Sequence, residues 1–302
     1  MKNSLKPALL LALVLCTLCV VAACGKKGIT SESSGNEGTT AEPAAPQTGN
    51  EETTGIPDTT TAPETTEPVT PVDPVVKKAV ITGGGAGNRI YSAIVELSGK
   101  KNPRVVILTT AGKDTVSNVT SYTNIYSKYT NDLEVITLCT KLYDPEELRQ
   151  KIINADIICV SGGQSEYMGD VWKKFKVDEY LREAYDRGVI CSGGSAGGMC
   201  WTYMGWNDFY SLPESVYDFY YGIDVINIYY GPHFNSSDKW AEFDSAIRKQ
   251  TDPKYTLGFA MDNGSAVIFI DGEPVKSIRE TGNERIFRYD FKDGKWARSV
   301  FK

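Results

Sequence analysis

The chain has 302 residues and a formal net charge of −6, but its negative charge is concentrated near one end. Residues 29–75 hold nine Asp or Glu and no Lys or Arg, and the first 27 residues hold four lysines. With those nine negative and four positive charges set aside, residues 76–302 carry a net charge of −1. A domain so close to neutral excludes a broad basic surface for nucleic acid and an acidic field for a cationic partner.

The first residues have the composition of a targeting segment. Lys2 and Lys6 precede an apolar run over residues 8–23, which is the length expected of a signal peptide and short for a membrane-spanning helix. The run ends in two alanines followed by Cys24, and this resembles the cleavage site of bacterial lipoproteins. We expect a signal peptide over residues 1–23, lipidation of Cys24 and a domain anchored to the outer side of the cell membrane. The alternative is an ordinary signal peptide in which the cysteine is incidental.

Residues 24–75 form the next segment, rich in Thr, Glu, Pro, Ser and Gly and nearly free of large apolar side chains. Such a segment cannot bury enough apolar surface to offset the entropy lost on ordering. We expect a disordered tether that holds the following domain, residues 76–302, away from the membrane.

From residue 77 onward, short β-branched runs alternate with amphipathic helical patterns. We expect strands at residues 79–82, 105–109, 133–138, 157–160 and 189–192, and helices at 90–97, 116–128, 145–154 and 177–187. After residue 255 the pattern changes to short strands at 266–270, 275–278, 286–289 and 297–301, with Asp-Gly turns between two of the pairs. This order predicts the α/β class: a mostly parallel sheet flanked by helices, with a C-terminal antiparallel extension.

A glycine-rich turn at residues 83–87 follows the first strand and could be taken for a nucleotide site. Asn88 stands where the third glycine of a dinucleotide-binding motif would be, and no suitable acidic residue follows the second strand. We therefore expect a plain turn between strand and helix.

Four cysteines lie in the predicted domain: Cys139, Cys159, Cys191 and Cys200. They form no Cys-x-x-Cys pair and no grouping with histidine, so the sequence predicts no metal site. Most lie in apolar runs and are expected to be small buried side chains, although spacing alone leaves a disulfide open.

Gly193-Gly194-Ser195-Ala196-Gly197 lies between a predicted strand and a helical pattern and has the spacing of a nucleophile elbow. In such an elbow a strained turn exposes the serine, and the flanking glycines allow the close backbone packing that the turn needs. The following helix N-terminus favours developing negative charge. The alternative is a Gly/Ser-rich loop without catalysis, or one that binds an anion.

His233 is the single histidine in the chain, and it follows the largely apolar run 223–230. A nucleophilic serine needs a base whose pKa is near neutral, so His233 is the one histidine that could serve Ser195. A third segment, Ser161-Gly162-Gly163-Gln164, follows the strand at 157–160 and could offer a backbone N–H to an oxyanion. Read separately, His233 could be structural and the 161–164 segment a flexible loop. The stretch from Trp201 to Tyr230 is aromatic and could either line the substrate cleft or pack in the core; it includes Trp206, Tyr210, Tyr217, Tyr220 and Tyr221.

Together these segments resemble the serine peptidase family that contains peptidase E (aspartyl dipeptidase) and cyanophycinase. The resemblance covers residues 77 to about 280 and rests on 162–164, 193–197, 232–234 and 258–264, in the family's order. It implies a three-layer fold like that of class I glutamine amidotransferases, hydrolysis of small peptides through an acyl-enzyme, and no cofactor. It implies Ser195 as nucleophile, His233 as general base, and the backbones of Gly163 and Ala196 as oxyanion hole.

The residue that orients His233 is the least certain part of the site, and three candidates are open. Asp262 is the first choice because a carboxylate could accept the second N–H of the imidazole and stabilise its charged form. Asn263 occupies the position of the family's Glu, and Asp208 lies between nucleophile and base as an Asp does in peptidase E. Peptidase E carries an Arg on the helix after its histidine that is linked to its preference for Asp. The corresponding stretch here offers Lys239 and no Arg until Arg248, so the resemblance does not imply aspartyl specificity.

The sequence leaves two other functions open. One is a different acyl-transfer enzyme on the same scaffold, an amidase or an esterase. The other is a non-catalytic lipoprotein that uses the fold to capture a ligand.

Overall fold

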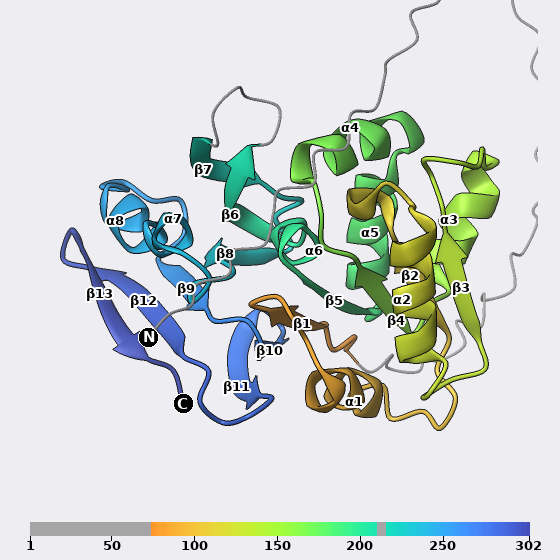
Figure 1. Cartoon of the computed structure of the whole chain (residues 1–302), viewed down its shortest axis with the longest axis horizontal. Coiled ribbons are helices and arrows are strands. Elements are labelled where there is room, and N and C mark those ends of the chain that lie inside the picture. The colour runs from red at the N-terminus through yellow and green to blue at the C-terminus, as the bar shows by residue number, and fades with distance from the viewer. Residues whose placement is uncertain (1–73, 210–215) are drawn as a thin grey trace, which may run out of the picture. The chain divides into compact units, whose positions relative to one another are not determined.

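The computed structural model describes residues 74–209 and 216–302 (Figure 1). The predicted signal peptide, Cys24 and nearly all of the predicted tether lie outside these residues. Within the described ranges, no helix is long and apolar enough to cross a membrane.

The first sheet carries the expected parallel core. Its strand order is β11-β10-β1-β5-β4-β2-β3, in which β1, β5, β4, β2 and β3 are parallel and the β10–β11 hairpin adds to β1 in antiparallel fashion. The strands are β1 (Lys78–Thr82), β2 (Val105–Leu108), β3 (Leu133–Ile136), β4 (Ile157–Val160), β5 (Ile190–Gly194), β10 (Ser265–Ile270) and β11 (Glu273–Arg279). All residues of β2 and β4 are buried, as expected of strands covered on both faces.

A second sheet has the order β13-β12-β9-β8-β6-β7. Its strands are β6 (Thr202–Phe209), β7 (Val216–Tyr221), β8 (Ile226–Gly231), β9 (Leu257–Met261), β12 (Ile286–Lys292) and β13 (Lys295–Val300). The predicted C-terminal extension is therefore divided: the β10–β11 hairpin extends the first sheet, whereas the β12–β13 hairpin pairs with β9 in the second.

Helices cover both faces of the first sheet (Figure 1). The helices are α1 (Asn88–Glu96), α2 (Val116–Tyr126), α3 (Pro145–Ile153), α4 (Ser165–Phe175), α5 (Val177–Asp186), α6 (Ala196–Met199), α7 (Asp238–Ala241) and α8 (Phe243–Arg248), with a short 3₁₀ turn η1 (Thr110–Gly112). Helices α1 and α2 pack on one face through a core that includes Ile90 and Tyr126. Helices α3, α4 and α5 pack on the other through a core that includes Leu148, Trp172 and Leu181. This arrangement confirms the predicted α/β class.

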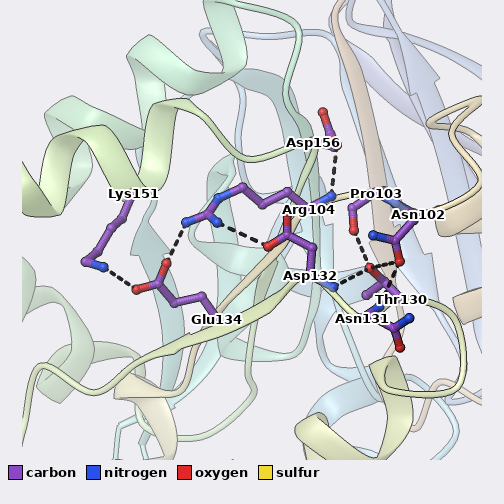
Figure 2. A network of polar contacts seen from close by, with 9 residues as sticks. All are labelled: Asn102, Pro103, Arg104, Thr130, Asn131, Asp132, Glu134, Lys151 and Asp156. Carbon is purple, nitrogen blue, oxygen red and sulfur yellow. Dashed lines mark hydrogen bonds and ion pairs between the residues drawn. The ribbon is translucent and has the colours of Figure 1, made fainter.

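A polar network joins the N-terminal ends of β2, β3 and β4 in the first sheet (Figure 2). Arg104, just before β2, forms ion pairs with Asp132 and with Glu134 of β3, at 3.1 and 2.6 Å. Its backbone N–H donates to the carboxylate of Asp156, just before β4. Lys151 of α3 also contacts Glu134. Each exposed pair contributes little to stability, but the shared carboxylates hold three neighbouring strands in register.

The four cysteines of the described residues, Cys139, Cys159, Cys191 and Cys200, are all free thiols. Three of them are buried in the sheet region, in agreement with their apolar sequence surroundings. No disulfide therefore joins strands within the described residues.

Candidate active site

Ser195 lies at the sharp turn between β5 and α6. Its backbone has φ 57° and ψ −130°, a conformation that L-residues rarely adopt and that exposes the side chain above the end of the sheet. The flanking glycines are required by close packing, because a Cβ on Gly193 would lie 2.2 Å from the carbonyl oxygen of Gly197. One on Gly197 would lie 2.0 Å from the carbonyl oxygen of Val160. The elbow expected from the sequence is present.

The turn is held from below by Tyr230 of β8, a residue that the sequence did not single out. The backbone N–H of Ser195 donates to the Tyr230 hydroxyl at 3.2 Å, and the hydroxyl donates in turn to the carbonyl oxygen of Thr82. Tyr230 is fully buried, and burial raises its pKa well above the ordinary range, so the hydroxyl stays protonated. Because this contact uses the N–H of Ser195, an oxyanion must be bound by other donors.

The glycine segment after β4 lies beside the serine. A Cβ on Gly162 would lie 3.3 Å from Cβ and 3.8 Å from Oγ of Ser195, so the two backbones are close. Gly163 has φ +146°, and Ala196 is the first residue of α6. Within the part of the chain that the structure describes, the backbone N–H of neither Gly163 nor Ala196 has a hydrogen-bond partner. These two donors are available near the nucleophile.

His233 follows β8 and is oriented by Asn263. The His233 Nδ1 and Asn263 Oδ1 atoms lie 2.6 Å apart, and the Asn263 Nδ2 donates to Ser236 Oγ at 2.7 Å. With its oxygen toward the ring, the amide can only accept, so Nδ1 must carry the proton and Nε2 is left as the basic nitrogen. The Trp240 ring packs edge-on against the imidazole, with centroids 4.9 Å apart. The sequence match to the family's Glu position correctly pointed to Asn263 as a neighbour of His233.

The imidazole is largely shielded from water, and this burial lowers the pKa of His233 below its ordinary value. Two opposing effects are smaller: the hydrogen bond to Asn263 and the negative charge of Asp208 both raise the pKa. Asp208 lies on β6, in the second sheet. At neutral pH the histidine is therefore uncharged, which is the state that a general base needs.

Asp262 does not orient the histidine, although it was the first choice from the sequence. Its carboxylate accepts from the backbone N–H and the Nε of Arg285, both at 2.9 Å, and from Nη2 at 3.2 Å. The side chain is 4 % exposed. A guanidinium that binds both carboxylate oxygens is a strong, directional partner, and Arg285 lies too far along the sequence to be foreseen. Of the three candidates, Asn263 forms the hydrogen bond to His233 Nδ1.

The glycine-rich turn after β1 connects the base to its orienting residue. The Gly83 carbonyl accepts from the N–H of His233, and the Gly84 carbonyl accepts from the N–H of Gly264, both at 2.8 Å. The N–H groups that open α1, which a bound phosphate would need, are instead bound by Glu280: Gly87 N–H and Ile90 N–H donate to its carboxylate at 2.9 Å. The expected plain turn is confirmed, and its role is to align two loops.

Ser195 and His233 line one cavity of about 400 Å³. Its wall includes Tyr91 of α1 and Tyr122 of α2, which sequence reasoning missed. The available signal concerned Tyr91 alone, which follows the glycine-rich turn at residues 83–87; the sequence around Tyr122 gave none. The aromatic residues proposed from the sequence lie elsewhere: Trp206 and Tyr217 pack in the core of the second sheet, and Tyr220 and Tyr221 line a different cavity. Tyr210 is outside the described residues.

No group of three or more His, Cys, Asp or Glu side chains in the described ranges is arranged to hold a metal ion.

The chain has an α/β fold in which a serine at a strained strand–helix turn and a histidine line one cavity, an arrangement typical of serine hydrolases. Residues 79–278 match peptidase family S51, and the chain belongs to this family of serine peptidases. The chain is 23 % identical over 222 residues to the uncharacterized peptidase YgaJ of Bacillus subtilis (strain 168), covering 70 % of this chain and 92 % of YgaJ.

Two crystal structures share the fold at 17 % sequence identity. One is a peptidase from an acI-B1 Actinobacterium, with a TM-score of 0.52 over 75 % of this chain and 95 % of that one. The other, from Listeria monocytogenes EGD-e, carries a provisional peptidase E assignment and has a TM-score of 0.50 over 68 % of this chain and 98 % of that one. The fold is that of class I glutamine amidotransferases, as the sequence motifs implied.

Proposed function

We propose that this peptidase hydrolyses small peptides through an acyl-enzyme formed on Ser195, with His233 as general base. The observation that carries the proposal is that the two residues line one cavity while Asn263 holds His233 by its Nδ1. This arrangement leaves Nε2 of a neutral imidazole as the proton acceptor.

The proposed reaction follows acyl transfer in two halves. Ser195 Oγ attacks the scissile carbonyl while its proton passes to His233, and the oxyanion accepts hydrogen bonds from the N–H groups of Gly163 and Ala196. The C–N bond then breaks as His233 returns the proton to the leaving amine. A water molecule, deprotonated by His233, hydrolyses the acyl-enzyme and regenerates the serine.

We assign the support of His233 to two residues. Asn263 fixes the ring by a neutral hydrogen bond, and Asp208 stabilises the imidazolium through its negative charge. An amide orients a catalytic histidine without charge in papain-like peptidases, so a carboxylate contact at Nδ1 is not required. Asp262 is left outside the catalytic group because Arg285 binds its carboxylate.

The small size of the substrate is supported by the cavity. At about 400 Å³ it lies near the lower end of the range for small-ligand sites, about 300–1,000 Å³. Backbone close to Ser195, including Gly162, narrows the approach, which favours short peptides over folded proteins.

Labelling with a fluorophosphonate probe tests this proposal. We expect stoichiometric labelling that is abolished in Ser195→Ala and retained in Ser121→Ala, a serine that lines the same cavity. Mass spectrometry of the labelled peptide identifies the site. Absence of labelling in the folded parent would favour the non-catalytic ligand-binding alternative, and labelled protein that cleaves only esters or simple amides would favour the esterase or amidase alternative.

We also propose that Cys24 carries a lipid anchor that places the domain on the outer side of the cell membrane. The support is the sequence alone: a basic start, an apolar run and two alanines before the cysteine. Replacing Cys24 by Ser should release the protein from the membrane fraction or leave an unprocessed precursor. Normal processing with detergent-requiring membrane association of the variant would contradict lipidation.

A further inference from the structure

The cavity beside Ser195 has a wall without formal charge. It is lined by Tyr91 and Ile94 of α1, by Tyr122 and Ile125 of α2, and by Cys159 and Ser192. Among the residues that the structure describes, none of those lining the cavity is Asp, Glu, Lys or Arg. Apart from His233 and Cys159, the side chains that line the cavity are apolar, aromatic or neutral hydroxyl groups.

The groups that could ionise in this wall remain neutral at physiological pH. Burial raises the pKa of Tyr91 and Tyr122 well above the ordinary value of a phenol. Burial also raises the pKa of the Cys159 thiol to about 11. Among the described residues, the lining thus offers hydrogen bonds and apolar surface but no charged side chain to pair with a substrate carboxylate or ammonium group.

The first two basic residues after His233 in the sequence, Lys239 and Arg248, form ion pairs outside the cavity. Lys239 contacts Glu242 at 3.1 Å, with 62 % of its side chain exposed. Arg248 forms an ion pair with Asp244 at 3.0 Å and donates to the carbonyl oxygen of Trp296. Neither lines the cavity, so neither can balance an acidic substrate side chain there.

We infer that the cavity selects an uncharged side chain, apolar or aromatic, on the substrate residue whose carbonyl is attacked by Ser195. A charged side chain entering it would lose its hydration without gaining a partner, whereas an apolar one would gain contact with Tyr91, Ile94, Tyr122 and Ile125. This specificity rests on the proposed peptidase function. It narrows the substrate class to peptides in which the residue whose carbonyl is attacked has an uncharged side chain.

Two dipeptide series measure the selectivity. In X–Ala, where X is Phe, Leu, Asp or Lys, we expect kcat/KM for Phe or Leu to exceed that for Asp and Lys by at least about tenfold, a modest difference for an apolar pocket. In Ala–X, where the variable side chain is on the leaving group, kcat/KM should vary less with X. The inference is overturned if Asp–Ala or Lys–Ala is cleaved as fast as Phe–Ala or faster. It is also overturned if kcat/KM varies with X only in the Ala–X series.

A designed countercharge gives a second, independent test. Ser121 lines the cavity from α2 and is exposed, so Ser121→Arg can place a guanidinium at the cavity without disturbing the core. We expect the ratio of kcat/KM for Asp–Ala to that for Phe–Ala to rise at least about tenfold. Asn124→Arg is the matched control, because Asn124 is an exposed residue of the same helix that does not line the cavity. An equal rise in both variants would contradict the role of the cavity.

Fluorophosphonate labelling distinguishes failure of this inference from failure of the proposed function. If Ser195 is not labelled, the peptidase assignment fails and the inference fails with it. If Ser195 is labelled, Phe–Ala should slow labelling at lower concentrations than Asp–Ala, even where turnover is slow. Better protection by Asp–Ala, or protection by no peptide of the series, overturns the inference while the nucleophile assignment stands.

Discussion

Asn263 Oδ1 lies 2.6 Å from His233 Nδ1, so a neutral amide occupies the position where a charged carboxylate commonly supports a catalytic histidine. We expect Asn263→Ala to lower kcat/KM about 10-fold to 100-fold, the equivalent of one hydrogen bond worth about 1–3 kcal/mol. Asn263→Asp should retain more activity than the alanine variant, because a carboxylate can still accept from Nδ1. Steady-state kinetics on the best X–Ala substrate provide the measurement.

Asp262→Asn is the matched comparison, since it alters the neighbouring residue with little change of shape. It weakens the contacts to Arg285 and should lower the free energy of unfolding by about 1–3 kcal/mol, with kcat/KM of the folded protein nearly unchanged. Denaturant unfolding and kinetics separate the two effects. A loss of activity in Asp262→Asn greater than in Asn263→Ala would restore Asp262 as the orienting residue.

The pH profile of kcat/KM reports the ionisation of His233 in the free enzyme. The reaction needs the neutral imidazole, and burial lowers the pKa of His233 below its ordinary value of 6.5. Activity should therefore be constant near neutral pH and decline on acidification, with a midpoint below 6.5. A midpoint above 6.5 would contradict the dominance of burial.

The same pH profile of kcat/KM tests the electrostatic effect of Asp208 on His233. Its negative charge raises the pKa of His233, so Asp208→Asn should move the acidic midpoint to lower pH. The variant should also turn over more slowly, because the imidazolium formed during attack loses a stabilising charge. An unchanged midpoint with unchanged kcat would exclude an electrostatic role for Asp208.

The hydroxyl of Tyr230 supports the elbow by accepting from Ser195 N–H and donating to the Thr82 carbonyl. Tyr230→Phe leaves two backbone groups without this partner and should lower the free energy of unfolding by about 1–3 kcal/mol. It should also slow fluorophosphonate labelling, because the turn that presents Ser195 is less well held. Tyr129→Phe, which removes a hydroxyl on the surface at 3.4 Å from its acceptor, is the control and should change neither quantity.

Much of the fold could be predicted because its signals are local. The strands β1, β2 and β4 are short β-branched runs, and the elbow needs glycines at fixed positions around Ser195. The helix α4 was missed because the segment around Gly162 was read as a loop, although Met168, Val171 and Trp172 bury one helical face. The assignment of β12 to the second sheet depends on its pairing with β9, a long-range contact that no local pattern encodes.

The sequence predicted that Ser195 and His233 lie at one site, but its first choice for the residue that contacts His233 Nδ1 was wrong. Asp262 and Asn263 are adjacent, and sequence reasoning favoured the one with a charge. Which of the two contacts His233 depends on two other residues: Arg285 binds the Asp262 carboxylate, and Ser236 accepts a hydrogen bond from the Asn263 amide. Such competition between neighbours depends on side-chain placement in three dimensions.

Gly84 has no side chain, and this makes room for His233 and Asn263. Gly84 has φ +103°, and a Cβ there would lie 2.3 Å from His233 Cε1 and 2.6 Å from Asn263 Oδ1. Gly84→Ala should therefore displace the imidazole and lower kcat/KM by about a hundredfold, as misplacement of a catalytic group by about 1 Å can do.

Gly99→Ala separates this clash from backbone strain. Gly99 also has a positive φ, +67°, but a Cβ there would meet nothing within 4 Å. Both variants should lose stability, by about 1 kcal/mol or more, because alanine disfavours positive φ. Only Gly84→Ala should lose activity in the folded protein, measured by kinetics at a temperature where both variants are native by circular dichroism. If Gly84→Ala keeps parental kcat/KM, the imidazole need not occupy the position seen against Gly84, and the assignment of Asn263 as its orienting residue fails with it.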